Sequence, residues 1–360
     1  MNLADLGAEV VKVERPGSGD DTRGWGPPWA DGESTYYLGL NRGKRSVALD
    51  LKDPGDLELA GTLIRRSDVV VENFRNGLMD ELGLGYEEAR HHNPGLIYCS
   101  IQGFTTDGPA ASLAGYDLLI QAMSGIMSIT GQPEDIPTKM GAAITDMTAG
   151  LYATIGVLAA LQHRERTGEG QRVDVSLFDS ALNALLNQAS AYLNASVVPN
   201  AQGNRHPSIA PYESFPAADR DFILAAANDR MWQRTCVAIG RDDLGDDERF
   251  RTNALRRTNV EELTTELSRT FTGGPAEHWI ALLREAGVPA GPINSIDEAF
   301  AWANEQHLDP TVGFEGTATR TVRSPIRLSE SHVGSTLPPP ALDEHGDDIR
   351  AWLSEPVDEG

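Results

Sequence analysis

The first half of the sequence alternates short runs of β-branched residues with longer helical patterns, and this alternation constrains the fold more than any other feature. The runs are EVVKVE (9–14), SVALDL (46–51), DVVVE (68–72) and LIYCSI (96–101). A helical pattern from Pro54 to about Arg66 follows the second run, with Asp53 as the expected N-cap. Strands that alternate with helices are typical of βαβ units, so we predict an α/β fold with a mostly parallel sheet.

Two later helical patterns are apolar on most faces. The first runs from Asp146 to about Arg166, and its large apolar residues at helical spacing are Met147, Leu151, Ile155 and Leu158. After an expected strand at 172–176, the second runs from Leu177 to about Leu193. Helices with so few polar positions are expected in a protein core or in an oligomer interface.

The composition changes at 197–208 (VVPNAQGNRHPS), which has the prolines, glycine and asparagines of a linker. Strands are expected near Ser214 and at Phe222–Ala226, followed by helices to about Gly287. We therefore predict a large Rossmann-like domain at 1–204 and a smaller α+β domain at 205–295. Residues 296–360 are expected to form a linker and a return to the large domain.

The charge of the chain restricts its partners. The sequence has 30 Lys and Arg against 53 Asp and Glu, a formal net charge of −23. Such a field repels nucleic acid and anionic membranes, so we expect neither as a partner. Only two cysteines occur, Cys99 and Cys236, which excludes a four-cysteine zinc site and fits a reducing cytoplasm. We expect no metal and no permanently bound cofactor.

A group of basic side chains near the start stands out in this acidic chain. Its members are Lys12, Arg15, Arg42, Lys44, Arg45 and Lys52. From composition alone, the group is either a solvated charged face or a local anion site within a repulsive field.

The sequence lacks the common catalytic motifs, which leaves carboxylate chemistry as the candidate. The sequence has no glycine-rich dinucleotide or P-loop motif, no G-x-S-x-G and no H-E-x-x-H. Asp146 follows the run MGAAIT (140–145) at the expected start of a helix, where the helix dipole and free N–H groups would hold it ionised. The simpler interpretation is an N-cap without function; the other is a carboxylate placed for covalent acyl chemistry.

Seven ordered segments resemble the class III CoA-transferase family (CaiB/BaiF type), which includes formyl-CoA and carnitine CoA-transferases and α-methylacyl-CoA racemase. The segments are ADLGAEVVKVERPGSGDDTRGWGP, NRGKRSVALDLK, VVVENFRNGLMDELGLGYE, SIQGFTTDGP, AGYDLLIQAMSG, TDMTAGLYATIGVLAAL and RTGEGQRVDVSLFDSAL. The resemblance implies a Rossmann-like large domain, a smaller domain and a homodimer of two interlocked subunits.

The resemblance also implies an activity. Members of this family pass CoA from an acyl-CoA to a free carboxylic acid, and coenzyme A is a substrate rather than a resident cofactor. Asp146 matches the catalytic aspartate of the family, which would form a mixed anhydride and then an aspartyl-CoA thioester. The sequence does not identify the two acids.

The CoA-binding positions follow by the same resemblance. Arg15 and Lys52 match positions that contact the adenine and phosphates, and further matched positions are Leu49, Asn73, Phe74, Arg75, Ala114, Tyr116 and Asp117. Arg42, Lys44 and Arg45 could still be structural, and Asn73 could merely cap a loop. Two positions depart from the family pattern: Glu81 stands where a cationic CoA contact is common, and Ala114 where a lysine can occur.

Tyr116 separates two branches of the family, because the racemases carry a histidine there. Tyrosine, with a reference pKa of about 10, is a poor base at neutral pH. A CoA-transferase is therefore predicted, with an acyl-CoA racemase or epimerase as the alternative. The family's first strand and loop would lie before Met1, so we also expect a chain that lacks this segment. A truncated CoA-binding dimer without catalytic activity is the third interpretation.

Overall fold

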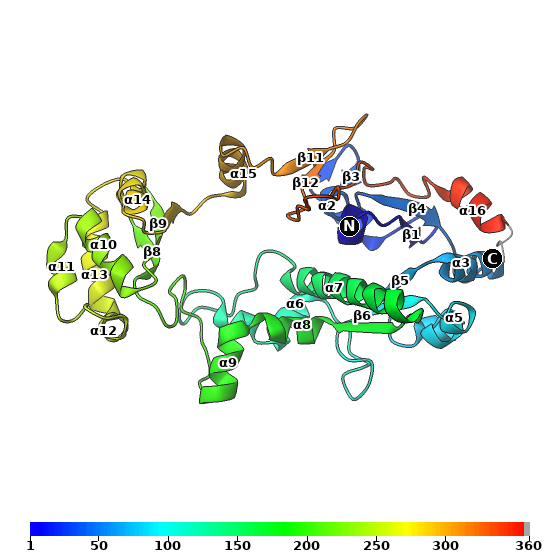
Figure 1. Ribbon diagram of the computed structural model, residues 1–360, viewed down its shortest axis with the longest axis horizontal. Coiled ribbons are helices and arrows are strands. Elements are labelled where there is room, and N and C mark those ends of the chain that lie inside the picture. Colours follow the sequence, from blue (N-terminus) through cyan, green and yellow to red (C-terminus); the bar gives the residue numbers. More distant parts are fainter. Residues whose placement is uncertain (356–360) are drawn as a thin grey trace. The chain divides into compact units, whose positions relative to one another are not determined.

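The computed structural model describes residues 1–355, and they form two compact units (Figure 1). Unit 1 comprises Met1–Ile126, Met140–Ser190 and the chain from His307 onward, and unit 2 comprises Met127–Lys139 and Ala191–Gln306. The boundaries after Ser190 and Gln306 lie near the sequence-based boundaries after 204 and 295. The predicted division into 1–204, 205–295 and 296–360 stays a prediction.

Unit 1 is a mixed α/β unit with parallel strands. Its strands are β1 (Val10–Glu14), β2 (Trp29–Ala30), β3 (Glu33–Ser34), β4 (Lys44–Ala48), β5 (Val69–Glu72), β6 (Ile97–Gln102), β7 (Arg172–Ser176), β11 (Thr311–Gly313) and β12 (Arg320–Val322). Its helices are α1 (Asn2–Asp5), α2 (Thr35–Leu40), α3 (Pro54–Arg66), α4 (Leu78–Glu81), α5 (Tyr86–His92), α6 (Asp117–Met123), α7 (Ile144–Thr167), α8 (Leu177–Ala184) and α16 (Gly346–Ser354). A 3-10 helix of unit 1, η1, spans Asp21–Gly24, and a second, η2 (Ile126–Ile129), begins at the last residue of this segment and continues into the chain assigned to unit 2.

The parallel strands form two sheets. β1 pairs with β4, and β5, β6 and β7 pair in that order, all of them parallel. The predicted α/β class with a parallel sheet is thus confirmed, although the parallel strands of the described residues are divided between two ladders rather than joined in one. β4 ends at Ala48, so the predicted strand residues 49–51 lie beyond it, in the turn that leads to α3.

Helices cover these sheets through small cores. Val47 and Leu49 pack with Ala60 and Leu63 of α3 and with Ile349 of α16, so the C-terminal segment packs within unit 1. The side chain of Asp53 accepts hydrogen bonds from the N–H groups of Gly55 and Asp56, which is the predicted N-cap of α3.

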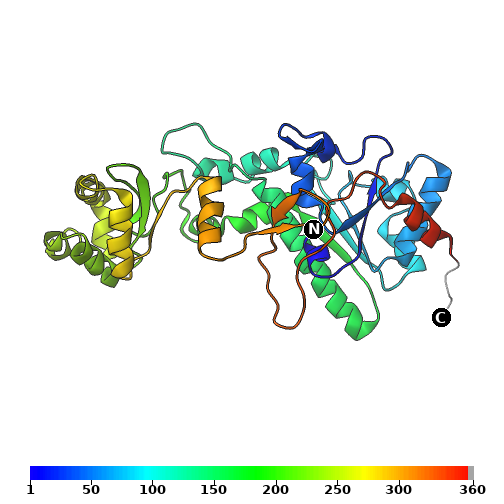
Figure 2. The ribbon, with the colours of Figure 1, turned by 90° about the horizontal axis from the view of Figure 1, so that it is seen from above.

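The long helix α7, green in Figure 2, packs against β6 and β7 through small residues. Ala153, Val157 and Ala160 are buried against Ile97 and Cys99. A Cβ at Gly156 would lie 2.7 Å from a methyl group of Val173, so glycine permits this close approach. Among residues 1–355, α7 is also the helix whose length and apolar composition would suffice to cross a membrane, a test that core helices of soluble proteins also pass.

The predicted apolar stripe of α7 faces away from the core of its own unit. Met147, Leu151, Ile155 and Leu158 are 44–60% exposed in the single chain. The next predicted helix is interrupted: α8 ends at Ala184, Leu186 has a left-handed φ of +45°, and α9 (Leu186–Ala195) begins there. The prediction of a single helix from Leu177 to about Leu193 was therefore wrong.

Unit 2 combines an antiparallel sheet with helices. Its strands pair in the order β10 (Ala290–Pro292), β9 (Asp221–Ala225), β8 (Tyr212–Pro216). Its helices are α10 (Asp229–Ala238), α11 (Asp242–Asp246), α12 (Asn253–Thr258), α13 (Val260–Phe271), α14 (Ala276–Glu285) and α15 (Ile296–Glu305). The core contains Phe215, Phe222, Trp232 and Phe271, beside the fully buried Arg256.

Candidate functional site

The predicted CoA positions follow the carboxyl ends of parallel strands. Arg15 comes directly after β1, and Leu49–Lys52 directly after β4, its parallel partner. Asn73–Arg75 comes directly after β5. Parallel strands end at the same edge of a sheet, and ligands of open α/β sheets bind at that edge. The predicted CoA positions that belong to one sheet therefore lie at the same edge of it, which is the edge where folds of this kind bind nucleotides.

Around β1 and β4, the three positions differ in what they offer a ligand. Arg15 is exposed and paired with Asp21 of η1. The side chain of Lys52 is exposed and has no hydrogen bond or ion pair with the described residues. Leu49 is 2% exposed and belongs to the core, and its N–H donates to the carbonyl of Glu14 at 2.9 Å, so its side chain is closed to a ligand.

After β5, two of the three positions are engaged by neighbours. The side-chain amide of Asn73 donates to the carbonyl of Ile101 on β6, which is the loop-fixing role that the sequence left open. Arg75 forms a two-pronged ion pair with Glu81 of α4, with Nη1 2.9 Å from Oε1. Phe74 is exposed.

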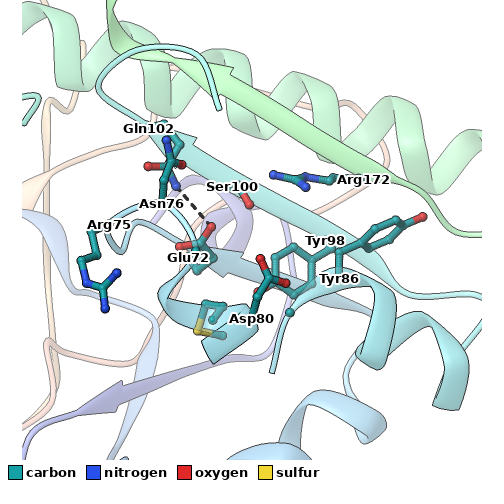
Figure 3. A pocket seen from close by; sticks show the side chains of 12 residues that line it. Glu72, Arg75, Asn76, Asp80, Tyr86, Tyr98, Ser100, Gln102 and Arg172 are labelled. Atoms are coloured by element: carbon teal, nitrogen blue, oxygen red, sulfur yellow. Dashed lines mark hydrogen bonds between the residues drawn. The ribbon is translucent and has the colours of Figure 1, made fainter. Parts of the chain in front are cut away.

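A small cavity lies beside Arg75 (Figure 3). Its volume is about 40 Å³, and its lining includes Glu72, Asp80, Tyr98, Ser100 and Arg172. Such a space holds a few water molecules at most and cannot enclose CoA. Among the described residues, no group of three or more His, Cys, Asp or Glu side chains is placed to hold a metal ion.

A close backbone contact places the Ala114–Asp117 segment beside the end of β6. A Cβ at Gly115 would lie 2.1 Å from the Cα of Gly103, so the two glycines permit the two backbones to touch. Ala114 and Tyr116 are both exposed, and Tyr116 is 70% exposed just before α6. Both side chains are thus accessible at the carboxyl edge of the sheet.

Asp117 is fully engaged in holding α7. Its Oδ1 accepts from the backbone N–H of Thr145 at 2.9 Å and from the hydroxyl of Thr145 at 2.8 Å. Its Oδ2 accepts from the amide of Gln121 at 2.7 Å. Asp117 therefore satisfies one of the free N–H groups at the start of α7, although it belongs to another helix.

Asp146 is not the N-cap of α7. The helix begins at Ile144, its N-cap residue is Ala143, and Asp146 is the third residue of the first turn. Its side chain is exposed, and surrounding protein atoms displace part of the water around the carboxyl group. This burial, and then the negative charge of Asp117, raise the pKa of Asp146.

Sequence reasoning missed Tyr36. This residue is the second of α2, and Ser34, the N-cap, accepts a hydrogen bond from its backbone N–H. Burial, followed by the charges of Asp146 and Asp117, raises the pKa of the Tyr36 hydroxyl, so this hydroxyl lies within electrostatic range of both carboxylates. Its ring meets Trp25 edge to face at 5.1 Å. No periodicity marks either aromatic residue; Trp25 lies in the first segment that resembles the family, and Tyr36 lies in none of them.

The structure thus brings Asp146, Asp117 and Tyr36 into one neighbourhood, with Tyr116 next in the chain to Asp117. What this neighbourhood offers chemically is one accessible carboxylate, a second carboxylate whose oxygens are occupied, and a phenol. The remaining predicted positions lie at the ends of β1, β4 and β5, as described above.

Comparison with known proteins identifies the relatives. The family described as CoA-transferase family III matches residues 1–346. The chain is 44% identical to the succinate–glutarate CoA-transferase of Agrobacterium fabrum, over 98% of this chain and 90% of that protein. It is 39% identical to the acetyl-CoA:oxalate CoA-transferase of Acetobacter aceti, over 98% and 91%.

Solved structures agree with these relatives. A CaiB/BaiF family protein from Brucella suis matches with a TM-score of 0.88 at 42% identity, over 98% of this chain and 94% of that one. Rv3272 from Mycobacterium tuberculosis matches with a TM-score of 0.86 at 33% identity, over 96% and 92%.

These matches correct one expectation. The prediction that the family's first segment is missing is not borne out, because the family match extends over residues 1–346. The third interpretation, a CoA-binding dimer without catalytic activity, is not supported by the relatives. The relatives are named as CoA-transferases. The chain belongs to CoA-transferase family III and is an enzyme of the CaiB/BaiF type.

Proposed function

We propose that this enzyme transfers CoA between two carboxylic acids through covalent intermediates on Asp146. The single observation that carries the proposal is the accessible carboxylate of Asp146 in the first turn of a helix that Asp117 holds in place. A carboxylate that has lost part of its water and has a raised pKa is a stronger nucleophile than a fully hydrated one.

The reaction would proceed in four balanced steps. The Asp146 carboxylate attacks the thioester carbonyl, the C–S bond breaks, and a mixed anhydride and CoA thiolate result. The thiolate then attacks the Asp146 carbonyl of the anhydride, which releases the donor acid and leaves an aspartyl-CoA thioester. The acceptor carboxylate attacks this thioester, which forms a second anhydride and frees the thiolate. Attack of the thiolate on the acceptor carbonyl yields the new acyl-CoA and restores Asp146.

Dicarboxylic acids are the proposed class of acid. The similar proteins are named for succinate, glutarate, oxalate and mesaconate, which share two carboxylates. The free ammonium of Lys52 and the guanidinium of Arg15 at the ends of β4 and β1 would bind the CoA nucleotide, and Arg75 would add a contact after β5. Cations at these points would offset the repulsion between CoA phosphates and a chain of net charge −23.

A homodimer is proposed from the outward stripe of α7. Large apolar residues on α7 and on α8 and α9 are exposed in the single chain, among them Ile155 at 60% and Leu186 at 72%. A contiguous apolar face of this kind marks a protein interface. An Ile155→Glu variant is expected to be monomeric by light scattering, whereas Gln162→Glu, an exposed change on the same helix, keeps the dimer. A dimeric Ile155→Glu protein would contradict this interface.

The interlocked arrangement, the cytoplasmic location and the absence of nucleic-acid and membrane partners stay predictions.

Covalent trapping tests the proposed mechanism. The protein is incubated with succinyl-CoA, treated with hydroxylamine or borohydride, digested and analysed by mass spectrometry. We expect a modification at Asp146 that is absent from Asp146→Asn. Asp179→Asn is the matched control, because Asp179 is also an exposed aspartate in the first turn of a helix. Transfer activity without modification at Asp146, or undiminished in Asp146→Asn, would refute the mechanism.

A further inference from the structure

Unit 2 contains a cavity of about 440 Å³ that the proposed reaction does not use. This volume lies in the range of small-molecule binding pockets. All the residues that line it belong to unit 2: Gln132, Pro133, Asn200, Ala201, Gln202, Asn204, Arg205, Glu213, Ser214, Arg257, Val260 and Glu261. Nine of these twelve side chains are polar or charged, so the cavity suits a polar ligand.

The walls of the cavity are fastened to one another. The N–H of Gly203 donates to the carbonyl of Gly131 at 2.9 Å, which joins the segment before the cavity to the segment after it. A Cβ at Gly203 would lie 2.5 Å from Oε1 of Gln132, so this side chain packs directly on the glycine backbone. Asn204 donates to the hydroxyl of Ser214 on β8 at 3.1 Å. These bonds define the shape of the cavity before any ligand enters.

Three of the four charged residues in the wall are paired with one another: Arg205 binds both Glu213 and Glu261, which leaves these three with a formal charge of −1. The Nε of Arg205 lies 3.3 Å from both carboxylate oxygens of Glu213, and its Nη1 lies 2.6 Å from Oε1 of Glu261. Glu213 also accepts from the hydroxyl of Thr264 at 3.2 Å. Both carboxylates in the wall therefore accept from Arg205, and Glu213 accepts from Thr264 as well.

Arg257 is the cation left over. It lies in the last turn of α12 and is half-buried, and its guanidinium has no hydrogen bond or ion pair with the described residues. The amide side chains of Asn200 and Gln202 in the same lining also have no side-chain hydrogen bond there. A guanidinium fork matches the two oxygens of a carboxylate, and primary amides both donate and accept.

We propose that this cavity is a binding site for a small organic acid whose carboxylate pairs with Arg257. One unpaired cation matches a single carboxylate rather than a nucleotide with several phosphates. The amides beside it would bind a second polar group of the same molecule. The proposal rests on the cavity alone and holds whether or not Asp146 is the nucleophile.

Titration calorimetry with the full-length protein tests the proposal. Glutarate is the probe, glutaramide is its uncharged counterpart, and sulfate represents a simple anion. We expect glutarate to bind and Arg257→Gln to weaken it about tenfold or more, the effect of losing a hydrogen bond to a charged group. Arg251→Gln is the matched control, because Arg251 is exposed, lies just before α12 and is absent from the cavity lining. Arg257→Lys keeps the charge and is expected to fall between wild type and Arg257→Gln.

Hydrogen–deuterium exchange locates the bound acid. Glutarate is expected to slow exchange in peptides covering 200–205 and 257–261 in the wild-type protein and not in Arg257→Gln. The proposal is overturned by equal affinity in Arg257→Gln and Arg251→Gln, by equal affinity for glutaramide, or by exchange protection confined to unit 1. An adventitious anion site, with sulfate bound as tightly as glutarate, would overturn it too.

Discussion

Asp117 of α6 and Asp146 of α7 are two carboxylates beside the start of α7, and they have opposite surroundings. Asp117 accepts three hydrogen bonds from Thr145 and Gln121, whereas the exposed carboxyl of Asp146 is left open to a reactant. The negative charge of the first raises the pKa of the second. The comparison teaches that an engaged carboxylate serves structure and charge placement, and that an unengaged one beside it is available for chemistry.

The largest expected effect is the loss of transfer in Asp146→Asn. Because this variant removes the nucleophile and keeps the shape of the side chain, we expect kcat to fall by about 10³-fold or more. Stability should change by less than about 0.5 kcal/mol, since Asp146 is exposed. Steady-state kinetics and urea unfolding measure both. A variant that keeps a tenth of the activity would remove the contrast between the two aspartates.

Asp117→Ala is expected to do the reverse and act mainly on stability. The substitution leaves the N–H and hydroxyl of Thr145 and the amide of Gln121 without their acceptor. Loss of a helix cap and of these bonds should cost about 2–3 kcal/mol of unfolding free energy, measured by urea denaturation. Thr145→Val, which removes only the hydroxyl bond, should cost less. If Asp117→Ala unfolds like the wild type, the structural role assigned to Asp117 is wrong.

The pH dependence separates the two carboxylates. Burial and Asp117 raise the pKa of Asp146 above its ordinary 3.8, so transfer should decline as the pH falls through that raised value. In Asp117→Asn one cause of the shift is gone, and the acid limb of the kcat/KM profile should move to lower pH. An unmoved limb would mean that Asp117 does not act on the titrating group.

Stability should show the matching sign. A carboxylate with a raised folded-state pKa binds protons more readily in the folded than in the unfolded state. Its ionisation therefore lowers stability as pH rises from its ordinary value of 3.8 through the raised value, and this cost is absent below that window. The difference in unfolding free energy between wild type and Asp146→Asn should appear above the window and vanish below it.

The fold was largely predictable because β-branched runs and helical spacing are local signals. The strands at 10–14, 69–72, 97–102 and 172–176 and the cap at Asp53 follow from them. Two features were not predictable in this way. The break at Leu186 depends on a left-handed backbone that no breaker residue announces. The orientation of α7 depends on Ala153, Gly156 and Ala160, whose small size lets the helix approach the sheet and turns its larger residues outward.

The site was predictable only in part, since its geometry arises from tertiary contacts. Asp146 was found from its place at a helix start. The N–H of Thr145 in the first turn of that helix, however, is bound by Asp117, which lies 28 positions before Thr145 in the chain. Tyr36 reaches the same neighbourhood from α2, and nothing local in its sequence indicates this. Leu49 was predicted from the resemblance to line the CoA site, but its side chain lies in the core.

The smallest expected effect concerns Arg75, whose side chain is paired with Glu81. In this respect it resembles Asp117, which is also held by neighbouring side chains. The side chains of Arg75 and Glu81 are both well exposed, so the ion pair is weak and screened by salt, and it competes with any phosphate for the same guanidinium. Glu81→Gln should free Arg75 and lower the KM for acyl-CoA by about twofold to fivefold at low ionic strength. The gain should disappear in a background of Arg75→Gln, and Glu87→Gln, an exposed change on α5, should have no effect. A gain that persists without Arg75 would mean that Glu81 acts through its own charge, and Arg75 would then have no part in binding CoA.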